Sequence, residues 1–276
     1  MRFDVVIRRL TLLAGVVTLL AAVLGTDGPA RAESESLTVG APHSLKAAFN
    51  EILPMFEREY GVPVHVVYTP SKTLLRQVEK GAAIDVFVAA GVEEVDYLYK
   101  KGRTLNGRPR VFAQTSLVLV MSAESTATSV SFRDALADHG TRIALGNPET
   151  SYLGEVSVRE LTKLSPAYAR RAHLTYAAHS EEILHLITTG KADVGLVYRA
   201  NLMNSGDVRI SDELPIGRNV SIQFGQAVVS NCRPSMRNAA EQFSDFLMQH
   251  RIQMLLVEHG FDLPRGGPAS VQSVSK

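Results

Sequence analysis

Two short segments of the chain place a serine hydroxyl where a predicted strand runs into a predicted helix. Thr38–Leu45 carries Ser44 after a Pro-His turn, and Val66–Thr73 carries Ser71 after a Thr-Pro turn. The first turn of a helix has free backbone N–H groups at the positive end of the helix dipole, and both favour an anion. Two such turns predict an anion held by neutral donors, which indicates binding rather than catalysis.

Strands and helices alternate around these two segments and along the rest of the chain. Apolar runs predict strands at Leu37–Gly40, Val64–Tyr68, Asp85–Ala90, Ser116–Met121, Arg142–Leu145, Ala192–Tyr198 and Ser221–Ser230. Helical spacing predicts a helix from Leu45 that Pro54 would kink or end. It predicts one further helix that follows the strand Asp85–Ala90 and runs through Tyr97. The other predicted helices are Thr73–Lys80, Phe132–Ala137, Gly154–Leu164, Ser180–Thr189 and the segment from Met236 to Val257. The alternation predicts an α/β fold with mostly parallel sheets and helices on both faces.

Two of the predicted strands, around Ser116 and Ser221, bracket the middle of the chain. We expect them to be crossings between two α/β lobes, with a ligand cleft lined by the loops at the strand ends. The chain has 276 residues, enough for two modest cores. The predicted division assigns residues 33–113 and 225–264 to the first lobe, 114–224 to the second, and 265–276 to a C-terminal tail.

The N-terminus has the pattern of a secretory signal peptide. Arg2, Arg8 and Arg9 precede an uncharged run from Leu10 to Thr26, and an Ala-Arg-Ala site ends at Ala32. This pattern predicts a signal peptide of residues 1–32 and a periplasmic protein. An uncleaved anchor is the alternative, although the run of 17 residues is shorter than the roughly 20 that a spanning helix needs.

Composition excludes several classes of function. Removal of residues 1–32, which hold four Arg and two Asp, changes the formal net charge from +1 to −1. A nearly neutral protein lacks the excess of positive charge that binding to nucleic acid requires. Cys232 is the single cysteine, so the chain forms no internal disulfide and no cysteine metal cluster. We expect Cys232 to be a small buried residue.

Six stretches in order resemble the molybdate-binding periplasmic proteins of ABC importers. The resemblance runs from Leu37 to Pro264, and its motifs are Ala41–Lys46, Ser71–Gln77, Gly81–Phe87, Gly146–Glu149, Gly195–Tyr198 and His259–Phe261. It implies a two-lobe periplasmic-binding-protein fold of type II and a monomer that delivers molybdate or tungstate to an ABC permease in the membrane. It implies no cofactor and no protein-ligated metal cation.

The resemblance also implies the residues that bind the tetrahedral oxyanion. Ser44 and Ser71 would each contribute a hydroxyl and a backbone N–H, Leu153 and Ser180 a backbone N–H, and Tyr198 its hydroxyl. His43 and Lys72 stand where the family more often has small neutral residues, and a cation at the pocket edge would change selectivity or make affinity depend on pH. A rigid pocket would bind molybdate and tungstate in preference to sulfate, because its ring of donors cannot shrink around the smaller anion.

The residues leave several alternatives open. Ser44 and Ser71 could be plain helix caps, and Tyr198 could be a buried core aromatic. The ligand could be another oxyanion such as sulfate, or a small organic anion, and the protein could act as a ligand sensor. Catalysis by Ser44, His43 and Asp85 is not expected, because the chain lacks a Gly-x-Ser-x-Gly turn and adjacent helical residues do not face each other.

Overall fold

The structure is a computed structural model that describes residues 35–127, 130–168, 173–203, 205–214 and 221–264. The predicted signal peptide, residues 1–32, and the predicted tail, residues 265–276, lie outside the described residues. Within those ranges, no helix combines the length and the hydropathy that crossing a bilayer requires.

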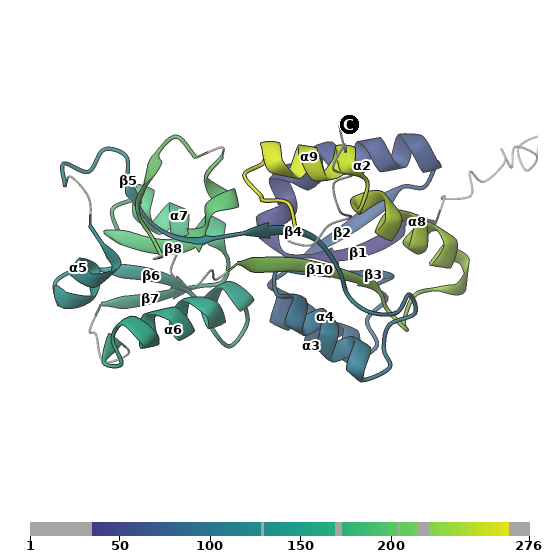
Figure 1. Ribbon diagram of the computed structural model, residues 1–276, viewed down its shortest axis with the longest axis horizontal. Coiled ribbons are helices and arrows are strands. Elements are labelled where there is room, and N and C mark those ends of the chain that lie inside the picture. Colours follow the sequence, from purple (N-terminus) through teal and green to yellow (C-terminus); the bar gives the residue numbers. More distant parts are fainter. Residues whose placement is uncertain (1–34, 128–129, 169–172, 204, 215–220, 265–276) are drawn as a thin grey trace, which may run out of the picture. The chain divides into compact units, whose positions relative to one another are not determined.

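The first sheet has the strand order β2-β1-β3-β10-β4. Its strands are β1 (Leu37–Ala41), β2 (Val64–Tyr68), β3 (Val86–Ala89), β4 (Arg110–Thr115) and β10 (Ile222–Val228). One face is covered by α2 (Lys46–Tyr60), α8 (Arg237–Leu247) and α9 (His250–Glu258), and the other by α3 (Ser71–Glu79) and α4 (Val92–Lys100) (Figure 1). Helix α2 follows the short 3-10 turn η1 (His43–Leu45), and η5 (Pro234–Met236) precedes α8.

The second sheet has the strand order β7-β6-β8-β5-β9. Its strands are β5 (Leu117–Ser122), β6 (Ile143–Gly146), β7 (Leu174–Ala177), β8 (Val194–Tyr198) and β9 (Val208–Glu213), and the 3-10 turn η3 (Arg199–Leu202) follows β8. Helices α6 (Tyr152–Leu164) and α7 (Ser180–Thr188) lie on opposite faces of this sheet, and α5 (Phe132–Ala137) lies near its outer end (Figure 1). The predicted α/β fold of two sheets with helices on both faces is confirmed.

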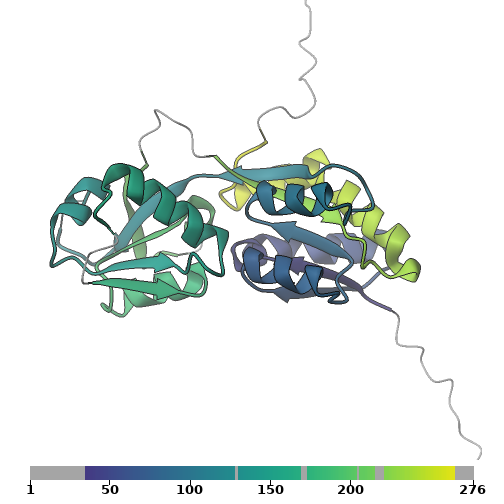
Figure 2. The same ribbon diagram turned by 90° about the horizontal axis from the view of Figure 1, so that it is seen from below.

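The chain crosses between the two sheets where β4 runs into β5 (Figure 2). It returns between β9 and β10, and both β5 and β10 pair only antiparallel. Among the strands described, four pairings are parallel and four antiparallel. The sheets are therefore mixed and not mostly parallel as predicted, since parallel pairing is confined to β1–β3 and β6–β8. The predicted lobe boundaries at residues 113 and 224 stay predictions; β4 ends at Thr115 and β10 begins at Ile222.

Helix α2 does not end at Pro54. It continues to Tyr60 and stops at Gly61, which has a φ of 68°, a left-handed conformation that glycine adopts without strain. Pro54 is exposed, so the backbone hydrogen bond that a proline removes is lost on the side where water can replace it. The alternative that this proline ends the helix early is wrong.

The returning chain is tied to the start of the first sheet by a buried carboxylate. Asp85, directly before β3, accepts from Thr38 N at 2.8 Å and forms an ion pair with Arg233 at 2.5 Å. Burial opposes ionisation of Asp85, yet these hydrogen bonds leave its pKa below the ordinary value. The neighbouring Cys232 is a buried free thiol, as predicted, and burial raises its pKa to about 11.

Candidate functional site

Four helical segments begin at one cavity between the two lobes. They are η1 with α2 after β1, α3 after β2, α6 after β6, and α7 after β7. Because parallel strands place their carboxyl ends at one edge of a sheet, each lobe presents two helix starts to the other. The cavity measures about 30 Å³, and one water needs roughly 10–15 Å³ of such space, so it suits a ligand of few atoms.

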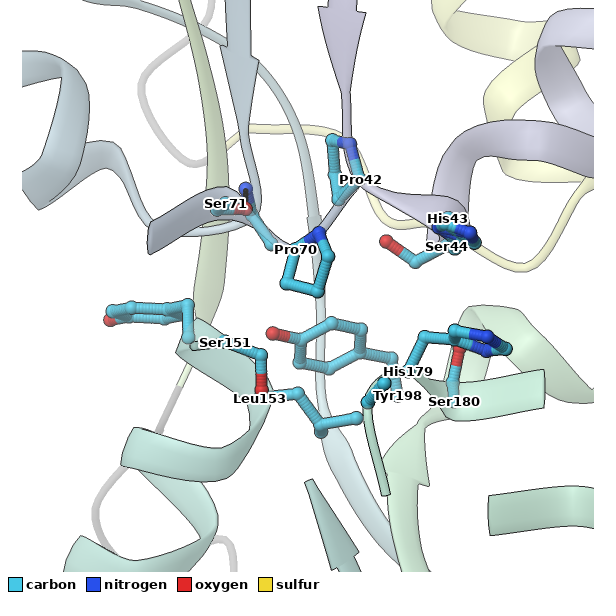
Figure 3. Close-up of a pocket in the computed structure, with 13 residues that line it drawn as sticks. Pro42, His43, Ser44, Pro70, Ser71, Ser151, Leu153, His179, Ser180 and Tyr198 are labelled. Atoms are coloured by element: carbon cyan, nitrogen blue, oxygen red, sulfur yellow. Dashed lines mark hydrogen bonds between the residues drawn. The ribbon is translucent and has the colours of Figure 1, made fainter. Parts of the chain in front are cut away.

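All five predicted anion-binding residues line this cavity. Ser44 and Ser71 lie on one side, and Leu153, Ser180 and Tyr198 lie on the other (Figure 3). The remaining lining residues are Pro42, His43, Pro70, Ala90, Ser151, Tyr152, Ala178 and His179. The two lobes therefore bring together residues that are more than 150 positions apart in the sequence.

Neither Ser44 nor Ser71 caps its helix. The N-cap positions of η1 and α3 are Pro42 and Pro70, neither of which makes a side-chain cap. Ser71 Oγ accepts a hydrogen bond from Ala90 N at 3.1 Å, which leaves its own proton free to be donated. Ser44 Oγ is buried and has no partner among the described residues. The alternative that these serines are plain caps is wrong.

The second lobe presents helix starts whose caps are other residues. Ser151 caps α6 by accepting from Gly154 N at 3.0 Å, and His179 caps α7 by accepting from Glu182 N through Nδ1 at 3.3 Å. Leu153 lies in the first turn of α6 and Ser180 in the first turn of α7, and each precedes the N–H group that is capped. Backbone N–H groups in the first turn of a helix have no acceptor within the helix. The N–H groups of Leu153 and Ser180 are available to a ligand.

Tyr198 ends β8 with its hydroxyl at the cavity. The ring is buried and packs edge-on against Phe224 at 5.8 Å between centroids, whereas the hydroxyl is buried without a hydrogen-bond partner. Burial, reinforced by the nearby charge of Glu94, raises the Tyr198 pKa well above its ordinary value. The ring is a core aromatic, as the alternative predicted, and its hydroxyl remains a protonated donor.

The cavity lining carries no Asp, Glu, Lys or Arg. Its ionisable groups are two tyrosines and the histidines His43 and His179, whose rings stack across the cleft at 4.4 Å with an angle of 7° between planes. Burial, and then proximity to His179, lowers the pKa of His43, so His43 is mainly neutral at pH 7. The donors at this site are therefore neutral.

Lys72 lies outside the lining and joins the lobes instead. Its ammonium donates to Pro148 O at 2.9 Å and pairs with Glu155 at 2.8 Å. Arg76 reaches the same loop through a bond to Glu149 O at 3.0 Å. These contacts connect α3 of the first lobe with the start of α6 in the second.

The residues considered for catalysis do not assemble. Asp85 is bonded to Thr38 and Arg233 at the amino ends of β1 and β3, whereas Ser44 follows the carboxyl end of β1. His43 stacks on His179 and is not paired with Asp85. No Ser-His-Asp relay is formed by these three residues.

Sequence reasoning missed two groups at the site. Tyr152 lines the cavity from the first turn of α6, and its only sequence signal was its place before Leu153. Glu94, a buried carboxyl in α4, gave no signal, because a Glu-Glu pair in the first turn of a helix is usually solvated.

A family model for bacterial extracellular solute-binding proteins matches residues 37–262. The match includes both sheets and every residue that lines the cavity. The chain belongs to this family.

Relatives of this solute-binding protein cover most of its length. The molybdate-binding protein ModA of Escherichia coli strain K12 is 27% identical over 241 residues, 86% of this chain and 92% of ModA. The putative ABC transporter substrate-binding lipoprotein YvgL of Bacillus subtilis strain 168 is 26% identical over 227 residues, 82% of this chain and 86% of YvgL. The solved structure of the Azotobacter vinelandii periplasmic molybdate-binding protein has a TM-score of 0.72 at 21% identity, covering 83% of this chain and 100% of that one. The predicted family resemblance is confirmed.

Proposed function

We propose that this protein captures a tetrahedral oxyanion, molybdate or tungstate, for an ABC importer. The observation that carries the proposal is the pair of buried hydroxyls, Ser44 Oγ and Tyr198 OH, that line the cavity without a partner. A buried polar group without a hydrogen bond costs free energy, so two such groups in one small cavity indicate a ligand that accepts from both. ModA, which is named for molybdate, aligns with most of the chain.

The donor set fits a fully ionised dianion. Ser44, Ser71 and Tyr198 donate from hydroxyls, and Leu153 and Ser180 donate from backbone N–H groups. Hydrogen bonds to an ionised acceptor are roughly twice as strong as neutral ones. No lining carboxylate repels the anion or accepts a proton from it.

The dimensions of the cavity weigh against the organic-anion alternative. About 30 Å³ leaves space for an anion of few atoms, and a rigid ring of donors cannot shrink around a smaller ion. Sulfate remains the competing ligand, since it has the same shape and charge as molybdate.

Calorimetric titration of the purified protein with molybdate, tungstate, sulfate and phosphate tests the proposal. We expect one-to-one binding of molybdate and tungstate, with sulfate at least tenfold weaker and phosphate weaker still. Tighter binding of sulfate would replace the proposed ligand, and no heat with any of the four anions would overturn the oxyanion function.

The cellular role belongs to the same proposal. The protein works as a monomer in the periplasm, released by cleavage after Ala32 or held by an uncleaved N-terminal anchor, and passes its anion to a membrane permease. Cell fractionation followed by N-terminal sequencing distinguishes the two forms. Recovery of the whole protein from the cytoplasm would contradict both.

A further inference from the structure

One buried carboxyl beside the cavity has no partner. Asp85, Glu94 and Glu160 are the buried acidic residues in the part of the chain that the structure describes. Asp85 is paired with Arg233, and Glu160 with Arg159 and Lys163. Glu94 is 7% exposed, and neither of its carboxyl oxygens has a hydrogen-bond partner among the described residues.

Glu94 belongs to the part of α4 that packs against the other lobe. A Cβ added at Gly91, the N-cap of α4, would lie 2.5 Å from the ring of Tyr152, and Tyr152 lines the cavity. Glu94 also exerts the largest charge effect on Tyr198, whose hydroxyl is the second unpartnered group at this place. Glu94 therefore lies one helical turn from a contact with the cavity lining, and its charge acts on the Tyr198 hydroxyl.

The groups facing Glu94 do not neutralise it. Glu155 faces it from α6, Tyr198 from β8, Lys72 from α3, and Glu93 from its own helix. Strands β3 and β10, on which α4 packs, contain no ionisable side chain. Lys72 is the one cation in this set, and its ammonium is bonded to Glu155 and Pro148.

An ionised Glu94 would be unfavourable twice over. It would be a buried charge without a counter-ion in contact, and it would repel a dianion in the cavity. Burial and then the charge of Glu155 raise the pKa of Glu94 to about 8, although Lys72 opposes the shift. The neutral acid avoids both costs.

We propose that Glu94 is the proton-binding residue of the oxyanion site, so that the closed protein holds the anion together with one carboxyl proton. This inference rests on the proposed oxyanion function. A bound dianion raises the proton affinity of Glu94 further, and by linkage the proton raises the affinity for the anion. Above about pH 8, binding of the anion takes up a proton from solvent, and the affinity falls by up to tenfold per pH unit.

Proton uptake is measured by titrating molybdate into the protein at about pH 8.5 in two buffers with different enthalpies of ionisation. The variants are Glu94→Gln, which keeps the shape of the neutral acid, and Asp96→Asn, which removes a partly exposed charge, paired with Lys100, from the same helix. We expect wild type and Asp96→Asn to take up a large fraction of one proton per anion. Glu94→Gln should take up none and bind more tightly than wild type at this pH.

The outcomes separate this inference from the function on which it rests. Molybdate binding without proton uptake by wild type, or equal uptake by Glu94→Gln, overturns the role of Glu94 and leaves the oxyanion function standing. Absence of binding to any oxyanion overturns both.

Carbon-13 NMR of the wild-type side-chain carboxyls tests the same proposal without a variant. One glutamate should titrate several pH units above the others, and molybdate should move its midpoint higher. A spectrum in which every glutamate titrates near its ordinary range would overturn the proposal.

Discussion

The two first-lobe serines of this site differ in how they are bonded, and this difference separates binding from stability. Ser71 Oγ accepts from Ala90 N, whereas Ser44 Oγ has no partner in the described structure. A hydroxyl without a partner destabilises the folded protein in the absence of ligand, and a bonded one stabilises it. The same substitution at the two positions should therefore move stability in opposite directions.

Ser44→Ala should weaken molybdate binding by about 1.5–3 kcal/mol, because a donor to a charged ligand is lost. Without ligand the variant should melt at the same or a higher temperature, since an unsatisfied hydroxyl has been removed. Ser157→Ala is the matched control, because Ser157 Oγ is buried and unpartnered but does not line the cavity. Calorimetry and thermal unfolding of both variants check the pair. Unchanged affinity in Ser44→Ala would remove Ser44 from the site.

Ser71→Ala should lower both affinity and stability. The variant loses a donor to the anion and leaves the buried Ala90 N–H without its acceptor, which costs about 1–3 kcal/mol of unfolding free energy. Denaturant unfolding without ligand measures the second effect separately from the first. Normal stability in this variant would show that the Ser71–Ala90 hydrogen bond contributes little.

At the scale of elements, the start of α6 depends on a glycine in close contact with backbone. A Cβ at Gly154 would lie 2.4 Å from the Asn147 carbonyl carbon and 2.5 Å from Gly146 O. Backbone cannot move aside as a side chain can. The helix start that presents the Leu153 N–H to the cavity is therefore fixed by contact with the loop after β6.

Gly154→Ala should lower the free energy of unfolding by about 1–3 kcal/mol, the usual cost of overpacking. It should also weaken anion binding, because the first turn of α6 must shift. Gly206→Ala is the control, since a Cβ there meets nothing within 4 Å. Equal stability of the two variants in denaturant unfolding would contradict the packing argument.

The sequence predicts the central strands of both sheets and misses three strands at their edges. The strands β4, β7 and β9 were not predicted, and each occupies an edge of its sheet. The sequences of β7 and β9 mix polar residues into the apolar pattern, as in Val208–Glu213, whereas the apolar edge strand β2 was predicted. The antiparallel insertion of β10 between β3 and β4 could not be predicted either, because its partners are distant in sequence.

The candidate site was easier to predict than the topology around it. The five residues carried over by position from the family resemblance all line one cavity, because each lies at or just after the carboxyl end of a strand. Lys72, expected at the pocket edge, is bonded to Glu155 and Pro148 of the other lobe and is not among the lining residues, and its effect on selectivity stays a prediction. Glu94 was missed because burial in the folded protein depends on tertiary packing, which the local sequence of α4 does not show.

At the scale of the whole molecule, Lys72 contributes to closure of the cleft. Its ion pair with Glu155 is partly exposed, and such a pair contributes about 0–1 kcal/mol. Lys72→Met should therefore weaken molybdate and sulfate by the same small factor, at most about fivefold. Lys100→Met, which removes a pair within one lobe, is the control. A changed ratio of the two affinities in parallel titrations would restore Lys72 as a selectivity residue.

Stability should depend on pH through Glu94. Its pKa rises from an ordinary 4.5 to about 8 in the folded protein, chiefly through burial, so the folded state binds more protons between these values. The free energy of unfolding should therefore fall as pH rises from about 5 to 8 and change little beyond. Glu94→Gln should flatten this slope in denaturant unfolding. An unchanged slope would assign the dependence to another group.

The insertion of β10 in the middle of the first sheet sets an order of assembly. Until Ile222–Val228 joins, β4 has no hydrogen-bonded neighbour in that sheet, and β2-β1-β3 ends at an unpaired edge. The five strands of the second sheet lie together between Leu117 and Glu213, so they need nothing that follows them in the chain. When the chain is synthesised from its N-terminus, the first lobe therefore begins first and is completed last. Its side of the cavity cannot form fully until β10 and the helices that follow it have been made.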